Sequence, residues 1–345
     1  MAHRTVPDAP VTEEKPFRPA RWLPGGHLQT IAPALFPLPP EPPSRRVVIE
    51  VEAASEAGDG SSVELLVSRT DSRPVRGTVL TVHGLGGSAR SGDSRRTAVQ
   101  ALAAGWHVAR LSLRNCGGTE ALASTLYNAT QSDDIGHVLA ALAAEGLPRP
   151  YAVVSFSLGA NQALLHAAEA GADCDADAIV AVNPAVDLHA ANRAIQRPIN
   201  LPYHLKYTQS LCRLLNRIRA VRDVPGPDAR WWQLRSVRRF DELYTVPDAG
   251  QPDVDSYYEV ASSGPRLGAV TVPSLILSAA DDPIVRLESF EAYRTPSGHP
   301  VQFEHPSSGG HCGYWQRGRP RAWAPGRALA FLETVVGSSR TRADA

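Results

Sequence analysis

The sequence has little that would draw the chain to a membrane or to nucleic acid. Its 35 basic and 35 acidic side chains cancel, so no global field attracts a polyanion. No apolar run approaches the roughly 18 residues of a membrane span, and residues 31–38 are interrupted by Pro33 and Pro37. Residues 1–19 lack the apolar stretch of a secretory signal. We therefore expect a cytoplasmic protein with no transmembrane segment and no nucleic-acid partner; peripheral contact with a membrane stays open.

Cysteine is also scarce, and its spacing fits neither a disulfide framework nor a metal site. A chain of 345 residues can bury a large core without disulfides, and no C-x-x-C motif occurs, so we expect reduced thiols. Histidines at 299, 305 and 311 recur every six residues, which places them on neither one helical face nor one strand face. Metal binding is not predicted. The four cysteines are Cys116, Cys174, Cys212 and Cys312.

Strand-like and helix-like stretches alternate after an N-terminal arm and Pro-rich connector at 1–44. This alternation predicts an α/β fold with a mostly parallel, doubly wound sheet of about eight strands. The first two strands are expected to be antiparallel, and Ser132 is expected to cap the helix that follows it. Strands are predicted at 46–51, 63–68, 78–82, 107–113, 151–155, 178–182, 274–279 and 301–304, and helices at 95–104, 132–145, 158–170 and 325–336.

The alternation fails between residues 187 and 267, which hold several helical pieces and many aromatic side chains. We interpret this stretch as a lid inserted into a core formed by 45–186 and 268–337. Such a lid would cover the carboxyl edge of the sheet, where open α/β folds bind ligands. Its aromatic residues either line an apolar binding site or only pack the lid. They are Tyr203, Tyr207, Trp231, Trp232, Tyr244, Tyr257 and Tyr258.

A candidate nucleophile stands where one strand passes directly into a helix. The strand at 151–155 runs into Ser155-Phe156-Ser157-Leu158-Gly159 and then into the helix at 158–170. A nucleophile elbow needs this strand, tight turn, serine and helix, so Ser157 is the predicted nucleophile. The usual first glycine is replaced by Ser155, and the turn is expected to survive because serine is small. The alternative is that Ser157 merely caps the helix.

A glycine-rich loop at 83–88 (HGLGGS) follows the strand at 78–82. In α/β-hydrolases this loop and the residue after the nucleophile each supply a backbone N–H to the oxyanion. We therefore predict Leu85 and Leu158 as donors, with His83 orienting the loop. The loop contains neither G-K-[ST] nor, because Arg90 stands at the last position, G-x-G-x-x-G. Neither a phosphate loop nor a dinucleotide cofactor is predicted.

The acid and the base of the site are expected in two late loops. The strand at 274–279 is followed by Asp281-Asp282-Pro283, and Asp282 is preferred because Pro-Ile-Val follows it directly; Asp281 is the alternative. His311 lies in a glycine-rich loop near the C-terminus. The order Ser157, Asp282, His311 is the one that α/β-hydrolases use.

These motifs together resemble the YheT-like group of α/β-hydrolases, which is related to eukaryotic abhydrolase-domain lipases. The resemblance implies that Ser157, Asp282 and His311 form the charge relay, and that carboxylic esters, often lipid-like, are cleaved without a cofactor. The chain departs from the group's glycines at Ser155, Asn115 and Ala160. The segments that carry the resemblance are 22–30 (WLPGGHLQT), 83–88 (HGLGGS), 114–119 (RNCGGT), 156–161 (FSLGAN), 280–283 (ADDP) and the lid segment 240–262.

The resulting hypothesis is a serine esterase that acts on a small-molecule ester. A serine at the elbow argues against dehalogenase and epoxide hydrolase chemistry, which require a carboxylate nucleophile. A second hypothesis keeps the scaffold but makes the chain a ligand-binding or signalling protein with little turnover. Substrate, acyl length and oligomeric state do not follow from the sequence.

Overall fold

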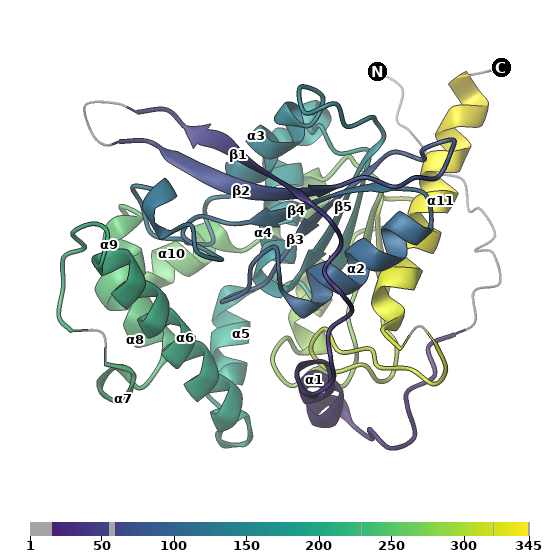
Figure 1. Cartoon of the computed structure of the whole chain (residues 1–345). Coiled ribbons are helices and arrows are strands. Elements are labelled where there is room, and N and C mark those ends of the chain that lie inside the picture. Colours follow the sequence, from purple (N-terminus) through teal and green to yellow (C-terminus); the bar gives the residue numbers. More distant parts are fainter. Residues whose placement is uncertain (1–15, 55–58, 229, 320, 344–345) are drawn as a thin grey trace.

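A single eight-stranded sheet organises the chain in the computed structural model, which describes residues 16–54, 59–228, 230–319 and 321–343 (Figure 1). The strand order is β1-β2-β4-β3-β5-β6-β7-β8. β2 pairs antiparallel with β1 and β4, and all other pairs are parallel. The predicted mostly parallel sheet is confirmed. The strands are β1 (Arg45–Glu52), β2 (Ser61–Ser68), β3 (Thr78–Val82), β4 (His107–Ser112), β5 (Tyr151–Phe156), β6 (Ala178–Val182), β7 (Ser274–Leu277) and β8 (Val301–Glu304).

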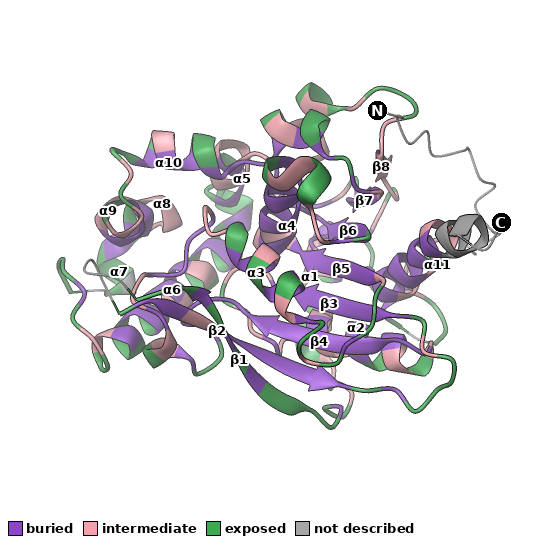
Figure 2. Cartoon of the chain, turned by 90° about the horizontal axis from the view of Figure 1, so that it is seen from above, coloured by how far each residue is buried: buried purple, intermediate pink, exposed green. Residues whose placement is uncertain are grey.

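Helices cover both faces of this sheet. One face packs against α2 (Gly92–Ala103) and α11 (Trp323–Ala343), and the other against α3 (Asp133–Ala141) and α4 (Ser157–Ala170). The central strands are therefore buried on both sides, which explains their continuous apolar sequences (Figure 2). In contrast, residues along the edge strand β1 alternate between exposed and buried from Arg46 to Glu52.

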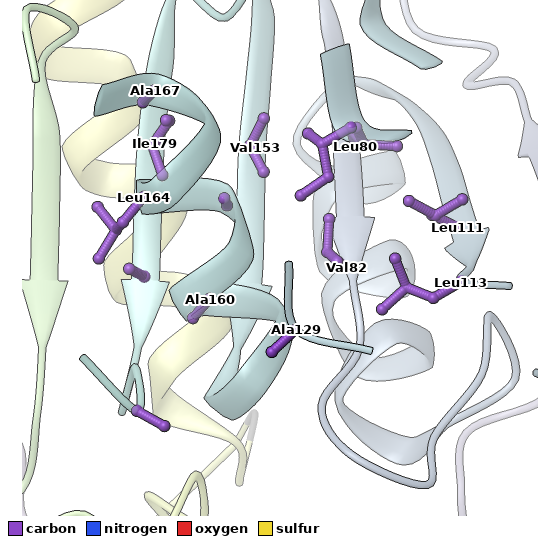
Figure 3. Close-up of a cluster of buried hydrophobic side chains, with 14 of the residues drawn as sticks. Leu80, Val82, Leu111, Leu113, Ala129, Val153, Ala160, Leu164, Ala167 and Ile179 are labelled. Carbon is purple, nitrogen blue, oxygen red and sulfur yellow. The ribbon is translucent and has the colours of Figure 1, made fainter. Parts of the chain in front are cut away.

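The small residues of α4 allow it to lie close against the sheet. Its Ala160 and Leu164 pack with Leu80, Val153 and Ile179 in the larger hydrophobic cluster (Figure 3). This cluster fixes the start of α4 relative to the ends of β3 and β5. The two loops that carry the predicted nucleophile and oxyanion donors follow those strands directly.

Helical segments fill the chain between β6 and β7, where the sequence alternation fails. They gather on one side of the sheet in Figure 1 and have a small hydrophobic cluster of their own, which includes Leu215, Phe240 and Tyr244. Asp241–Thr245 forms a π-helical turn. The helices are α5 (Leu188–Ile195), α6 (Leu201–Arg219), α7 (Trp231–Leu234), α8 (Val237–Phe240), α9 (Val246–Asp248) and α10 (Val254–Ala261), followed by a 3-10 helix at Gly264–Ala269.

One local expectation is wrong. The hydroxyl of Ser132 does not cap α3; it donates to a carboxylate oxygen of Glu169 on α4 at 2.7 Å. The backbone of Ser132 is already helical, with φ −68° and ψ −32°, whereas a capping residue is usually extended. The hydroxyl therefore joins two helices instead of ending one.

No helix in the described ranges is both long and apolar enough to cross a bilayer.

Candidate functional site

Ser157 occupies a strained turn between β5 and α4. Its φ is +52°, in the left-handed region that non-glycine residues seldom adopt. The loop after β3 approaches this turn so closely that only glycine fits at position 159. A Cβ on Gly159 would lie 2.1 Å from the carbonyl oxygen of His83. Ser155 is accommodated within β5, because its buried hydroxyl donates to the carbonyl of Val180 at 3.2 Å.

A continuous chain of hydrogen bonds connects Ser157, His311 and Asp282. The Nε2 atom of His311 lies 2.8 Å from Ser157 Oγ, and Nδ1 lies 2.8 Å from Asp282 Oδ2. Because a carboxylate only accepts, we assign the ring proton to Nδ1, which leaves Nε2 free to accept from the serine hydroxyl. The alternative acid, Asp281, accepts instead from the backbone N–H of Gly310 at 2.8 Å.

Asp282 is held on every side by donors. Its Oδ1 accepts from the backbone N–H groups of Ile284 and Val285 at 2.7 and 3.0 Å. Its Oδ2 accepts from His311 and from the side-chain amide of Asn183 at 2.6 Å. The side chain is fully buried, so these bonds replace the water that a carboxylate would otherwise need.

Asn183 is a site residue that the sequence analysis missed. It follows β6 with φ +48°, and its amide also donates to the carbonyl of Gly310 at 3.3 Å. Its Oδ1 accepts from the N–H of Cys312 at 3.3 Å. The side chain of Asn183 thereby connects Asp282 to the residues directly before and after His311. The signal that the sequence offered was an asparagine directly after a buried strand.

The N-terminal helix α1 (Gly26–Leu35) also holds the His311 loop, which the sequence did not predict. Thr30 Oγ1 accepts from the backbone N–H of His311 at 2.9 Å. Gln29 is fully buried and forms two bonds with the backbone of Trp315, at 3.1 and 2.7 Å. The two backbones pack so closely that a Cβ on Gly310 would lie 2.3 Å from the carbonyl oxygen of Gly26. The W-L-P-G-G-H-L-Q-T segment at 22–30 therefore holds the loop that carries His311 in place.

The loop after β3 is shaped by His83. Its Nε2 accepts from the backbone N–H of Leu113 at 3.1 Å, so Nδ1 carries the proton that bonds the carbonyl of Gly84 at 2.8 Å. Complete burial lowers the pKa of His83 to about 4, which keeps the ring neutral near pH 7. The prediction that His83 orients this loop agrees with these contacts.

The two predicted oxyanion donors adjoin Ser157. Leu158 lies in the first turn of α4, where helix N–H groups lack intrahelical partners. Leu85 follows Gly84, at which a Cβ would lie 3.0 Å from the Cβ of Ser157. Both leucines line the same cavity as Ser157 and His311. The arrangement can support nucleophilic attack on a carbonyl carbon with negative charge stabilised beside it.

Residues 77–318 match the family described as alpha/beta hydrolase fold. The chain belongs to this family. The YheT-like resemblance is confirmed as well, because the candidate esterase YheT of Escherichia coli (strain K12) is 30% identical over 97% of this chain and 98% of its own length. By homology the protein is therefore an esterase-like hydrolase.

Other relatives of this α/β hydrolase are more distant. A monoacylglycerol lipase of Saccharomyces cerevisiae is 24% identical over 76% of this chain and 60% of its own. An esterase structure from Pyrococcus furiosus has a TM-score of 0.56 at 17% identity, covering 94% of this chain and 99% of the other. At that identity the similarity concerns the fold alone.

The periodic histidines of the hydrolase lie in separate environments. His299 Nε2 lies 3.2 Å from the carbonyl of Gly268, and His305 Nδ1 lies 3.2 Å from the carbonyl of Ser278. Within the described parts of the chain, no three histidine, cysteine or acidic side chains are placed to hold a metal ion.

Two cavities of unequal size meet at Ser157 and His311. The first, called the apolar cavity, has a volume of about 110 Å³ and lies beneath the helical segment between β6 and β7; its walls include Leu158, Leu188, Ile195, Val237, Ile284 and Val285. The second, called the polar cleft after its charged side chains, has a volume of about 520 Å³ and lies between α1, the 83–87 loop and α6. Its walls combine the polar residues Ser91, Asp93, Arg96, Tyr203, Lys206 and Ser210 with an apolar part that includes Ile31, Pro33, Ala34, Phe36 and Leu38.

A buried polar network from three helical segments also borders the apolar cavity. The hydroxyl of Tyr258 donates to Asp241 Oδ2 at 2.7 Å and accepts from the amide of Asn192 at 2.9 Å. Burial raises the pKa of Asp241 to about 6. Asp241 begins the π-helical turn, a local irregularity that gave no sequence signal.

Proposed function

We propose that this protein hydrolyses carboxylic esters through an acyl-enzyme on Ser157, with His311 as general base and acid and Asp282 as the third member of the triad. The observation that carries the proposal is the unbroken path from Ser157 Oγ through both nitrogens of His311 to Asp282, with each step at 2.8 Å. The left-handed backbone of Ser157 supports it, because such strain is typical of a nucleophile elbow.

The reaction begins when Ser157 Oγ attacks the ester carbonyl and its proton passes to His311 Nε2. The backbone N–H groups of Leu85 and Leu158 donate to the oxyanion that forms, and each such donor is worth about 3 kcal/mol. Asp282 holds the ring orientation and stabilises the imidazolium. The intermediate collapses as His311 protonates the leaving alkoxide, which departs as an alcohol.

The second half of the reaction repeats these roles with water. His311 removes a proton from a water molecule, which attacks the acyl carbon while the same N–H groups hold the oxyanion. Return of the proton to Ser157 Oγ releases the carboxylic acid and regenerates the enzyme. In the proposed domain organisation, the core at 45–186 and 268–337 carries the catalytic residues. An arm precedes it at 1–44, and a lid at 187–267 covers the apolar cavity.

The test is hydrolysis of p-nitrophenyl butyrate by the wild type and by Ser157→Ala. We expect kcat/KM to fall by at least about a thousandfold, because removing a triad nucleophile leaves only binding and oxyanion stabilisation. A fluorophosphonate should label the wild type at Ser157 alone. Ser289→Ala is the matched control, since among the described residues its hydroxyl bonds only the carbonyl of Arg286, and Ser289 lines neither cavity. Equal turnover in wild type and Ser157→Ala would overturn the proposal in favour of a binding protein on this scaffold.

A further inference from the structure

We propose that the preferred substrate joins a short apolar acyl group to a larger, hydroxyl-bearing alcohol, and that Asp93 in the polar cleft selects this alcohol. The inference rests on the proposed ester hydrolysis and adds the substrate class. It is carried by the unequal size of the two cavities that meet at Ser157, and by an unpaired carboxyl group in the larger one.

The apolar cavity is too small for a long acyl chain. Its volume is about 110 Å³, whereas an apolar cavity of about 150 Å³ in another protein holds a single benzene molecule. Hydrocarbon side chains from the core and from α5 form most of its wall, including Leu158, Leu188 and Ile195. These walls favour a hydrocarbon group, and the volume restricts it to a few carbons.

The polar cleft has about 520 Å³ of space, so the bulkier half of the ester fits there. Ser157 and His311 line both cavities, so an alcohol held in this cleft departs within reach of the group that must protonate it. Lys206 stands on its wall from α6, and α6 contains no acidic residue. In the described ranges Lys206 makes no ion pair, so its ammonium group is free to bind a substrate oxygen.

Asp93 is the only acidic residue that lines this cleft among the residues described. It lies half-buried in the first turn of α2, with neither a hydrogen bond nor an ion pair to another described side chain. Burial raises the pKa of Asp93, and the positive charges of Arg96 and Lys206 act in the opposite direction. A desolvated carboxyl group without a partner is costly unless a ligand or solvent supplies donors.

The neighbouring cation does not satisfy Asp93, because Arg96 is fixed elsewhere. Its guanidinium donates to the carbonyl of Pro33 at 2.8 Å and lies 5.2 Å from the ring centre of Trp315. The cleft therefore offers a free acceptor at Asp93 and a free donor at Lys206. A hydroxyl group both donates and accepts, so an alcohol with several hydroxyl groups satisfies both residues, whereas a simple alkyl alcohol satisfies neither.

The experiment measures kcat/KM for esters that vary one half at a time. The acyl series is acetyl, butyryl, octanoyl and palmitoyl on glycerol; the alcohol pair is glyceryl butyrate against propyl butyrate, which has the same number of carbons in each half. We expect the highest value at acetyl or butyryl, and a preference of about tenfold for the glyceryl ester, the size of one charge-assisted hydrogen bond.

Two variants assign these preferences to the two cavities. Asp93→Asn should lower the glyceryl-to-propyl ratio about fivefold or more. The control Asp133→Asn, an exposed aspartate on α3, should leave the ratio unchanged. Leu188→Ala enlarges the apolar cavity and should move the acyl optimum to a longer chain without changing the alcohol ratio. Thermal unfolding of each variant checks that it is folded.

Several results would overturn the inference while leaving ester hydrolysis intact. These are an optimum at octanoyl or palmitoyl, a glyceryl-to-propyl ratio near one, or an unchanged ratio in folded Asp93→Asn. Faster hydrolysis of the choline or phosphoglycerol ester of butyrate than of glyceryl butyrate would replace the hydroxyl-bearing alcohol by a charged one. Failure of the proposed function itself is recognised separately, by absence of fluorophosphonate labelling at Ser157.

Discussion

Asp281 and Asp282 carry the same functional group in adjacent positions, yet their surroundings differ in kind. Asp282 is buried, accepts four hydrogen bonds and contacts the ring of His311. Asp281 is partly exposed and accepts from one backbone N–H. The chemistry of the carboxyl group therefore does not distinguish them; the donors that surround it do.

This difference predicts unequal effects of two isosteric substitutions. Asp282→Asn replaces an acceptor by an amide and disfavours the Nδ1-protonated tautomer of His311, so kcat should fall by roughly ten thousandfold, as in other Ser–His–Asp enzymes. Asp281→Asn should lower kcat less than about tenfold, because its single bond is to the neutral backbone. Kinetics with p-nitrophenyl butyrate check both, and a larger loss in Asp281→Asn would reverse the assignment.

The limits of sequence reasoning at this scale are visible in Asn183. Ser157, His311 and Asp282 were predicted because each follows a strand in a recognisable local pattern, and the structure brings them within hydrogen-bonding distance; their catalytic roles stay predictions. Asn183 follows a strand too, but its partners lie 99 and 127 positions away. Nothing local to an asparagine indicates which distant carboxylate it will bind.

At the scale of elements, the strands were predicted well and the bracing helix was not. Strands buried on both faces must be continuously apolar, so their sequences are distinctive. Helix α1 contains Pro33 and ends by residue 35, and its function depends on polar contacts with a loop about 280 positions away. Such contacts leave no periodic pattern in the sequence.

The bracing role of α1 predicts a loss of rate without a matching loss of binding. Thr30→Val keeps the shape of the side chain but removes the acceptor for the N–H of His311. We expect kcat to fall about tenfold, because the base is less well oriented, with KM changed less than twofold. Thr334→Val on α11 is the control, because within the described ranges its hydroxyl bonds only the carbonyl of Ala330 in the same helix. A rise in KM with unchanged kcat would contradict this role.

At the scale of the whole molecule, two buried titratable groups make opposite contributions to stability between pH 4 and 6. Burial raises the pKa of Asp241 from 3.8 to about 6, so the folded protein binds more protons there than the unfolded chain and loses stability as pH rises. Burial lowers the pKa of His83 from 6.5 to about 4, so stability rises with pH over the same window. The two effects partly cancel in the wild type.

Replacing Asp241 should leave the pH dependence of stability that His83 produces. Asp241→Asn keeps an acceptor for the Tyr258 hydroxyl but cannot ionise. Its free energy of unfolding relative to wild type should therefore increase between pH 4 and pH 7, by up to about 3 kcal/mol. Urea unfolding at a series of pH values measures this difference, with Asp133→Asn as the exposed control. A difference that is flat or falls with pH would show that burial of Asp241 does not govern its ionisation.

The contact between α1 and the His311 loop also bears on the order in which the parts of the site can form during synthesis. A ribosome makes Thr30 281 residues before its partner His311, and Gln29 286 residues before its partner Trp315. A nascent chain that has already formed β3, β5 and the turn at Ser157 still lacks His311 and the other residues that α1 contacts. Under the proposed mechanism, a chain whose translation stops before residue 311 lacks the residue that activates Ser157, so hydrolysis requires synthesis to pass residue 311.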